Sequence, residues 1–291
     1  MIGKRLLYIF LGLFILSESV SASVQDPIKI ACVGNSITYG SQVANREKNA
    51  YPEQLQAMLG EQYKVRNFGI GGRTLLKKGD RPYWETKAYE EALQFKPDVV
   101  FIKLGTNDSK LQNRSHMADF ETDYIDLINS FVEANKNARI VLLLPVPAFT
   151  SDTTGIWNQV IAKKIIPLTQ SVAYKTKSEV LDLYQLFVDQ PGLLPDKVHP
   201  SSLGATVIAK RLYETVIQKE TEPLEILKSK EIKVIQTENF YGYHLSNFEF
   251  LGNAGKLVQP KKPAPGAPWV LRARFWGHEP QTDIALLERG F

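Results

Sequence analysis

Residues 28–38 read IKIACVGNSIT, an apolar run that ends in the polar turn Gly34-Asn35-Ser36. An apolar run stopped by glycine and polar residues predicts a short buried strand that leads into a turn. Cys32 lies among apolar neighbours in this run, so we expect it to be a core residue. Similar apolar runs, each followed by a polar or glycine-containing loop, recur along the chain and decide the fold class.

The further strands are predicted at 63–68, 98–104, 138–144 and 180–183. Helical patterns lie between and after them, at 50–59, 88–95, 117–134, 156–176 and 201–218, with a kink expected at Pro167. This alternation predicts a central parallel sheet covered on both faces. Right-handed crossovers then give an α/β fold, a three-layer α/β/α flavodoxin-like sandwich. In such sheets the functional site is expected at the carboxyl ends of the strands.

The composition fits this class. The chain has 291 residues, of which 44% are hydrophobic and 23% charged, proportions that exclude a disordered, collagen-like or disulfide-dense protein. A net charge of +4 is too small to favour a nucleic-acid partner. Cys32 is the single cysteine and has no partner for an internal disulfide. The four histidines lack the spacing of a helical zinc motif, so no metal site is expected.

The N-terminus has the layout of a signal peptide, predicted at 1–22. Lys4 and Arg5 precede an apolar run of 11 residues, 6–16, and small or polar residues follow up to Ala22. A membrane-spanning helix needs about 20 apolar residues, so a stable membrane anchor is the weaker interpretation. We therefore expect cleavage after Ala22 and a periplasmic or secreted protein.

Four loops follow predicted strands in order and carry most of the polar residues that could do chemistry. They are GNSIT at 34–38, NFGIGGRT at 67–74, GTND at 105–108 and DKVHP at 196–200. At these loops the sequence resembles the SGNH hydrolase superfamily, also called GDSL esterases, over about 28–218. The resemblance implies the SGNH hydrolase fold and a serine esterase that needs no cofactor. Asn35 stands where the family most often has Asp, although some branches carry Asn.

Three residue types in these loops point to nucleophilic catalysis. The hydroxyl of Ser36 needs a base to remove its proton, and His199 can act as that base. Asp196, three residues before His199, can hold the other ring nitrogen. Taken alone, Asp196 is better explained as a helix N-terminal carboxylate, and His199 as an exposed loop residue. Together with the other loops they predict a catalytic triad.

An ester hydrolase also needs donors for the developing oxyanion. The resemblance implies the backbone N–H of Ser36, the backbone N–H of Gly72 and the side-chain amide of Asn107. Gly71 or Gly69 takes the place of Gly72 if the loop register differs. A plain turn with positive φ is the other explanation of Gly72.

Several residues indicate a carbohydrate substrate. Tyr83 and Trp84 follow the second loop and have aromatic faces of the kind that stack on sugars, although ordinary core packing also explains them. Arg73 suits a carboxylate of an acidic sugar or a structural salt bridge. The overall pattern resembles sialate-type O-acetylesterases of glycan-degrading Bacteroidota, which implies an acetylated saccharide substrate. The alternatives are a lysophospholipase or thioesterase of the same superfamily, and a non-catalytic glycan-binding SGNH fold.

The domain organisation expected from the sequence has four parts. The signal peptide at 1–22 precedes the hydrolase domain at 27–218, a charged linker at 219–233 and a β-rich C-terminal segment at 234–291. Within that segment 269–276 is strand-like and 282–288 helix-like. Residues 276–280 resemble the loop before the first helix of α/β-hydrolases, so the segment is expected to open a truncated second domain of that type. A small β-rich accessory module is the alternative.

Overall fold

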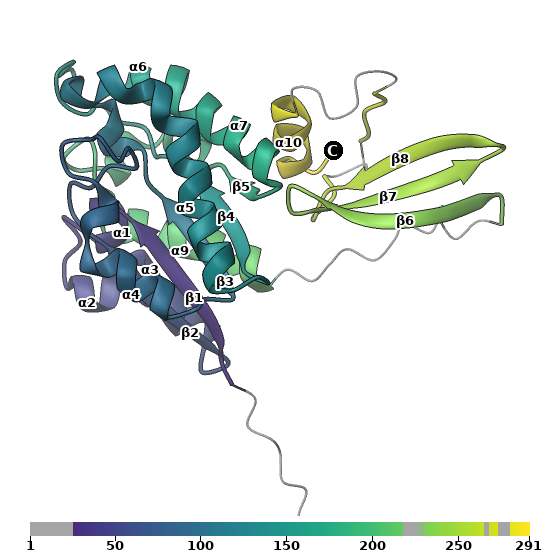
Figure 1. The fold of residues 1–291 in the computed structure, drawn as a ribbon, viewed down its shortest axis with the longest axis horizontal. Coiled ribbons are helices and arrows are strands. Elements are labelled where there is room, and N and C mark those ends of the chain that lie inside the picture. The colour runs from purple at the N-terminus through teal and green to yellow at the C-terminus, as the bar shows by residue number, and fades with distance from the viewer. Residues whose placement is uncertain (1–25, 218–226, 228–229, 265–267, 273–279) are drawn as a thin grey trace, which may run out of the picture.

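The computed structural model describes residues 26–217, 227, 230–264, 268–272 and 280–291. Its central sheet has five parallel strands in the order β2-β1-β3-β4-β5 (Figure 1). The strands are β1 Ile28–Gly34, β2 Tyr63–Gly69, β3 Val99–Lys103, β4 Arg139–Leu143 and β5 Glu179–Leu181. This order is that of the flavodoxin-like doubly wound fold, so the predicted fold class is confirmed.

Helices cover both faces of the sheet, because the strands present apolar side chains on both sides. One face packs against α4 Lys87–Gln94, α5 Phe120–Ala134 and α7 Ile166–Thr176. The other face packs against α1 Ser36–Tyr39, α3 Tyr51–Leu59, α8 Leu183–Phe187 and α9 Ser202–Ile217. The short α2 Arg46–Asn49 lies next to α3. Cys32 is fully buried on the α3 and α9 face, as expected for a core residue.

The strand order reverses at β1, which lies between β2 and β3. In register, Gly34 at the end of β1 pairs with Gly69 of β2 on one side and Lys103 of β3 on the other. The three loops that follow these strands therefore leave the sheet at one place. Ligand sites of doubly wound folds lie at such a reversal.

Two helical segments differ from the sequence prediction. The region predicted as one helix at 156–176 contains α6 Asn158–Val160, a π-helical turn Ile161–Ile165 and then α7. Pro167 lies in the first turn of α7, where its missing N–H costs no internal bond, so the irregularity precedes the proline. The first part of the region predicted helical at 117–134 belongs to a 3-10 segment, η3 Leu111–Asp119, and α5 begins at Phe120.

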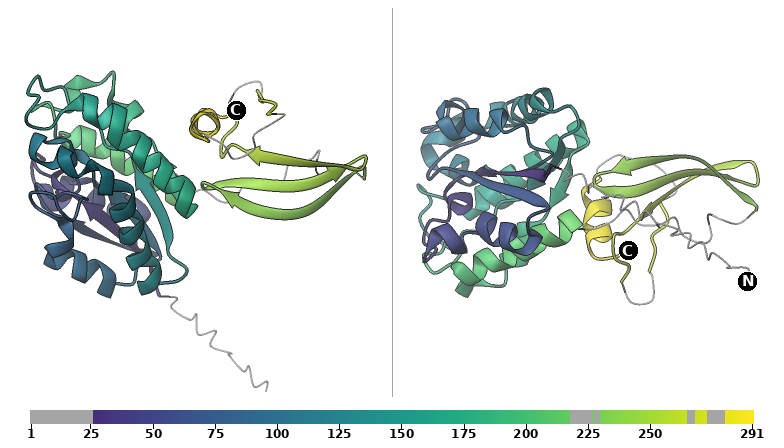
Figure 2. Two further views of the ribbon diagram at one scale, coloured as in Figure 1. Left: turned by 45° about the horizontal axis from the view of Figure 1, so that its top comes forward. Right: turned by 90° about the horizontal axis from the view of Figure 1, so that it is seen from below.

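The C-terminal segment forms a three-stranded antiparallel sheet, β6 Ile232–Phe240, β7 Tyr243–Phe250 and β8 Asn253–Gln259, with the helix α10 Gln281–Glu288. It lies beside β5 at the edge of the sandwich (Figures 1 and 2). Tyr241 stacks on Tyr174 of α7, and Lys261 contacts Glu179 of β5 at 3.5 Å. The predicted β-rich character and the helix near the C-terminus are thereby confirmed.

Some segments predicted near the ends of the chain lie wholly or partly outside the described residues. The signal peptide at 1–22 lies outside them, as do 219–226 and 228–229 of the expected linker. Residues 273–276 of the strand-like run and 276–279 of the hydrolase-like loop lie outside them as well. β6 begins at Ile232, two residues before the expected boundary. Residues 269–272 of the strand-like run are irregular. Within the described ranges, no helix has the length and apolarity that crossing a bilayer requires.

Candidate active site

Ser36 stands at the start of α1, directly after the end of β1. Its neighbour Asn35 is fully buried and caps the helix, since its side-chain oxygen accepts a hydrogen bond of 3.2 Å from the backbone N–H of Ile37. The tight strand-to-helix turn requires glycine at two nearby positions. A Cβ at Gly34 would lie 2.1 Å from Thr38 Oγ1, and one at Gly69 would lie 2.2 Å from the backbone nitrogen of Tyr39. This packing holds the half-buried Ser36 side chain at the sheet edge.

Asp196 and His199 share one turn just before α9. A single carboxylate oxygen of Asp196 accepts hydrogen bonds from the backbone N–H groups of Val198, at 3.0 Å, and His199, at 2.6 Å. Between them Lys197 has a φ of 70°, in the left-handed region that non-glycine residues rarely occupy. Such strained residues cluster at functional sites. The turn therefore fixes the histidine relative to the carboxylate through the main chain.

The structure brings these residues together with Ser36. The other carboxylate oxygen of Asp196 lies 2.6 Å from His199 Nδ1, and His199 Nε2 lies 2.8 Å from Ser36 Oγ. Burial raises the pKa of Asp196, but hydrogen bonds from the backbone and ring of His199 and from Val198 outweigh it, so this pKa lies below its ordinary value. An ionised Asp196 holds Nδ1 protonated and leaves Nε2 facing the hydroxyl.

Asn107 and Gly72 lie in the neighbouring loops. The buried amide of Asn107 donates a hydrogen bond of 2.9 Å to the carbonyl oxygen of Arg73. A primary amide carries two hydrogens, so the second is available to another acceptor. Gly72 has a φ of 75°, and no hydrogen bond within the described residues uses its backbone N–H or that of Gly71. The N–H of Gly69, in contrast, is bonded to Asn67 Oδ1 at 2.9 Å, which removes Gly69 as a free donor.

Asp108 joins the second and third loops, a connection that the sequence analysis missed. Its fully buried carboxylate accepts hydrogen bonds from the backbone N–H groups of Leu75, at 3.1 Å, and Leu76, at 2.8 Å. Burial raises the pKa of Asp108 to about 6, although these hydrogen bonds oppose the shift. The side-chain amide of Asn113 adds a bond of 2.9 Å to the carbonyl of Asn107. An acidic residue next to Asn107 at the end of an apolar strand was the signal available in the sequence.

Lys103 is a second buried ionisable group that the sequence analysis did not single out. It ends β3, is fully buried, and its ammonium nitrogen lies 2.9 Å from Thr106 Oγ1, one residue before Asn107. Burial lowers the pKa of Lys103 to about 7. A lysine inside the otherwise apolar run at 98–104 was the signal for this feature.

The predicted substrate residues have mixed outcomes. Tyr83 is fully buried and its hydroxyl donates to the carbonyl of Phe68 at 2.7 Å, so no face of its ring is open to a sugar. This contradicts the role expected for Tyr83, and ordinary core packing is its explanation. Trp84 is half-buried, donates its indole N–H to Leu75 at 2.7 Å and packs against Lys77 and Tyr89.

Arg73 is half-buried beside Gly72. Its Nη1 lies 3.4 Å from the carbonyl of Pro82, and its buried Nε has no hydrogen-bond partner. Within the described residues it forms no salt bridge, so the structural ion pair considered from the sequence is absent there.

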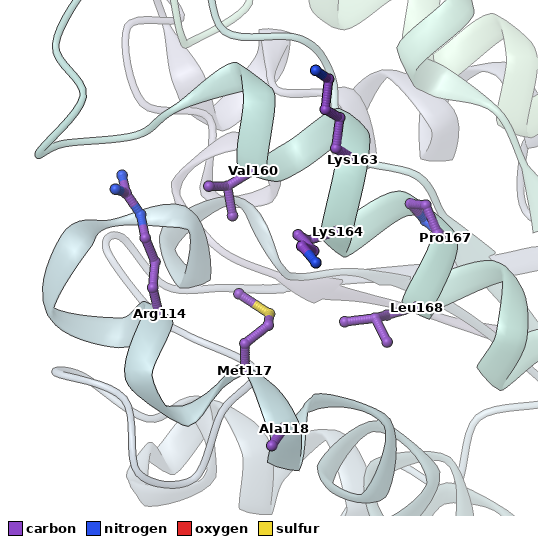
Figure 3. A pocket seen from close by; sticks show the side chains of 8 residues that line it. All are labelled: Arg114, Met117, Ala118, Val160, Lys163, Lys164, Pro167 and Leu168. Carbon is purple, nitrogen blue, oxygen red and sulfur yellow. The ribbon is translucent and has the colours of Figure 1, made fainter.

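One cavity of the structure lies away from these residues. It measures about 600 Å³ and lies between η3 and the α6–α7 region (Figure 3). The residues that line it are Arg114, Met117, Ala118, Val160, Lys163, Lys164, Pro167 and Leu168. None of them is a predicted site residue. Among the described residues there is also no group of three His, Cys, Asp or Glu side chains arranged to hold a metal ion.

Comparison with known proteins agrees with the fold and with the position of the loops. Residues 32–207 match the model of the GDSL-like lipase/acylhydrolase family. A curated relative, an acetylxylan esterase from Xylanibacter ruminicola, is 39% identical over 211 residues, which cover 66% of this chain and 44% of that protein. The chain thus spans less than half the length of that relative.

Solved structures show the same fold. A lipase/acylhydrolase from Enterococcus faecalis is 25% identical with a TM-score of 0.53, over 65% of this chain and 95% of the other. A carbohydrate acetylesterase from Sinorhizobium meliloti is 16% identical with a TM-score of 0.52, over 65% and 98%. The family model alone covers more than half of the sequence, including all four loops. The chain belongs to the GDSL-like lipase/acylhydrolase family, as its resemblance to SGNH hydrolases predicted.

Proposed function

We propose that this protein is a serine esterase that removes O-acetyl groups from carbohydrates. The observation that carries the proposal is the continuous contact from Asp196 through His199 to Ser36, with distances of 2.6 and 2.8 Å. The relative at 39% identity is an acetylxylan esterase, which supports an acetylated saccharide as the substrate. Because the match covers 44% of that relative, the activity and substrate are inferred here from this chain's own residues as well.

In the first step Ser36 Oγ attacks the carbonyl carbon of the acetyl ester while His199 Nε2 takes the hydroxyl proton. The carbonyl π electrons move to the oxygen, which becomes an oxyanion. That oxyanion accepts hydrogen bonds from the backbone N–H groups of Ser36 and Gly72 and from the free hydrogen of the Asn107 amide. Collapse of this intermediate breaks the ester C–O bond, and His199 gives its proton to the departing sugar oxygen, which leaves as a hydroxyl group.

In the second step water attacks the acetyl-serine, and His199 removes a proton from that water. The second oxyanion uses the same donors, and its collapse releases acetic acid and returns the proton to Ser36 Oγ. Asp196 stabilises the positive charge that His199 carries in both transition states. No residue changes redox state, and each proton that His199 accepts is returned.

The two alternative functions are less well supported. A lysophospholipase or thioesterase needs a long apolar cleft beside the nucleophile, whereas the cation Arg81 lies over Gly72. A non-catalytic glycan-binding fold would have no need to keep His199 within 2.8 Å of Ser36. These contacts favour an active esterase.

We also propose that the protein is exported and that its hydrolase domain, 27–218, is followed by a linker, 219–233, and a separate C-terminal segment. The charged, apolar and small-residue order of 1–22 supports export. Mass spectrometry of the protein produced in a secreting bacterial host tests this idea. A mature N-terminus at Ser23 is expected, and an intact Met1 in the exported fraction would contradict it.

The esterase assignment is tested by acetate release from acetylated xylan, acetylated sialic acids and acetylated pectin. Wild-type protein is expected to release acetate from at least one of them, and Ser36→Ala is expected to release none above the uncatalysed rate. Long-chain acyl esters serve as the comparison. Turnover of those esters without acetate release from any glycan would replace the carbohydrate proposal by the lipid alternative.

A further inference from the structure

Arg81 lies over the glycine that we assign to the oxyanion hole. Its Nη1 is 3.0 Å from the position that a Cβ would occupy at Gly72, and its Cζ is 3.5 Å from that point. The Arg81 residue is solvent-exposed. A guanidinium group therefore stands at the edge of the proposed reaction centre, open to whatever is attached to the ester.

The main chain holds Arg81 in this place. The carbonyl of Arg81 accepts a hydrogen bond of 3.0 Å from the backbone N–H of Thr74, and the carbonyl of Thr74 accepts one of 3.0 Å from Tyr83. The loop between residues 72 and 83 thus folds back on itself. The position of Arg81 is consequently fixed by the same loop that supplies Gly72, so the two stay together.

The two lysines of this loop are already neutralised, but Arg81 is not. Lys77 contacts Asp126 at 2.6 Å, and Lys78 contacts Asp119 at 2.9 Å. Arg81, like Arg73, forms no salt bridge within the described parts of the chain. This contrast within one loop indicates that the charge of Arg81 is available to a bound molecule.

The nearest acidic residue in sequence is also engaged elsewhere. The carboxylate of Asp80 accepts hydrogen bonds from Asn113, at 3.0 Å, and Gln112, at 3.1 Å, and lies 3.6 Å from Lys110. Burial raises the pKa of Asp80, but the bond from Asn113 and the charge of Lys110 bring it below its ordinary value. Asp80 is therefore an ionised carboxylate with partners of its own.

Arg73, the residue after Gly72, adds a second guanidinium to this loop. Its Nε is buried without a hydrogen-bond partner, and its Nη1 has only a long contact, 3.4 Å, to Pro82. Unpartnered guanidinium donors are costly to bury and match the planar geometry of a carboxylate. Both guanidinium groups thus belong to the loop that supplies the proposed oxyanion donor, and Arg81 lies over that donor.

We propose that Arg81, supported by Arg73, forms a subsite for a carboxylate on the saccharide that carries the acetyl ester. The preferred substrates are then acetylated acidic sugars, such as uronic-acid residues, over acetylated neutral sugars. This proposal rests on the esterase function proposed above and specifies its substrate class. It adds a charge contact beside Gly72 and leaves the acyl-transfer steps unchanged.

The test uses two substrates that differ only at C6, where one has a carboxylate and the other a neutral hydroxymethyl group. They are a methyl glucuronide and a methyl glucoside with the same single O-acetyl group, and kcat/KM for acetate release is measured on the full chain. Wild-type protein is expected to favour the glucuronide by about tenfold or more, the size of one charge-assisted hydrogen bond. Raising the ionic strength is expected to reduce this preference.

Three variants identify the source of the preference. Arg81→Gln is expected to remove most of it, Arg81→Lys to retain part of it, and Arg73→Gln to weaken it less than Arg81→Gln. Lys136 is an exposed residue just before β4, at the amino-terminal end of the strand and therefore away from the loops of the site. Lys136→Gln also removes one positive charge, and it is expected to keep the wild-type ratio of kcat/KM between the two sugars. Thermal melting of each variant checks that it is folded.

The outcomes separate the subsite from the esterase function. Acetate release from both sugars at equal kcat/KM would overturn the subsite and leave the esterase proposal intact. An equal fall on both sugars in Arg81→Gln would assign Arg81 a structural role and overturn the subsite as well. No acetate from either sugar, together with none from the glycan panel, would remove both proposals.

Discussion

The side-chain amide of Asn107 donates a hydrogen bond of 2.9 Å to the carbonyl oxygen of Arg73. This bond joins the loop after β3 to the loop after β2, and it uses one of the two amide hydrogens. The amide plane is thereby fixed, which leaves the second hydrogen with a set direction. The oxyanion hole that we propose is held in advance by a contact outside the reacting atoms, the arrangement that electrostatic catalysis requires.

Replacement of Asn107 by alanine is expected to lower kcat by roughly 10²–10³-fold, because one oxyanion donor contributes about 2.7–4 kcal/mol in the transition state. Loss of the bond to Arg73 is expected to cost about 1 kcal/mol of stability in addition. Acetyl-ester kinetics and a melting curve measure the two effects separately. An Asn107→Ala protein with wild-type kcat would exclude the donor role.

Asp108 is expected to act as a positioning residue for the second loop. In Asp108→Asn one of the two backbone N–H groups, of Leu75 or Leu76, faces an amide NH₂ and loses its acceptor, at a cost of about 1–3 kcal/mol. We expect a lower melting temperature and a kcat reduced by about tenfold, with KM for a small acetyl ester nearly unchanged, because Gly72 moves with this loop.

The matched control for Asp108 is Asp126→Asn. Asp126 is a carboxylate on the surface of α5 that contacts Lys77 of the same loop, with about half of its side chain exposed. Exposed pairs of this kind contribute at most about 1 kcal/mol. Equal losses of kcat in the two variants would show that the loop is not held through Asp108.

Gly69 is expected to tolerate no side chain. A Cβ there would meet the backbone nitrogen of Tyr39 at 2.2 Å, so in Gly69→Ala the helix α1 must move, and Ser36 with it. We expect destabilisation of about 1–3 kcal/mol and a clear loss of kcat. Gly71→Ala is the control, since nothing lies within 4 Å of its Cβ position and its N–H is retained. If the two variants behave alike in melting and kinetics, the close approach of α1 to β2 is not what positions Ser36.

Glu288 is expected to make the stability of the protein fall as the pH rises. Its carboxylate accepts a hydrogen bond of 3.3 Å from the backbone N–H of Asp182. Burial, together with the charge of Asp182, raises the pKa of Glu288 from 4.5 to about 7. The folded state therefore holds this proton more tightly than the unfolded state. The contribution of Glu288 to the free energy of unfolding is fully present below pH 4.5 and is lost as the pH rises to about 7.

Glu288→Gln imitates the protonated form and is expected to flatten this part of the pH dependence. Arg211 and Arg289 also face Glu288 and reduce the effect without reversing it. Melting temperatures at pH 5 and pH 8 measure the difference for wild type and variant. Glu249→Gln, at an exposed residue of β7, is the control. A variant with the same difference between the two pH values as wild type would contradict the expectation.

The sandwich could be predicted from sequence because its signals are local. Apolar runs such as 98–104 stop at glycine, and amphipathic helices of ordinary length follow them. Ser36, Asp196 and His199 were predictable for a related reason, since each lies in a loop directly after a predicted strand or before a predicted helix. The register of parallel strands then brings these loops to one edge.

Which individual side chains of a loop point into the core and which point towards solvent could not be predicted in the same way. Tyr83 and Trp84 are adjacent in sequence, but the pairing of Thr74 with residues 81–83 turns Tyr83 into the core and leaves Trp84 half-buried. The approach of Arg81 to Gly72 arises from the same pairing within the loop. Such contacts depend on how a loop closes, which no periodic pattern in the sequence records.

The base and its carboxylate are three residues apart, whereas Ser36 is 163 positions before His199. The Asp196–His199 turn is stabilised by its own backbone, so it can form before the rest of the chain is in place. Ser36 reaches it only when α3 packs on α9 and β1 enters the sheet. A phosphonate reagent that labels Ser36 stoichiometrically would therefore count completely folded molecules during refolding, and its signal should lag behind the recovery of helical content.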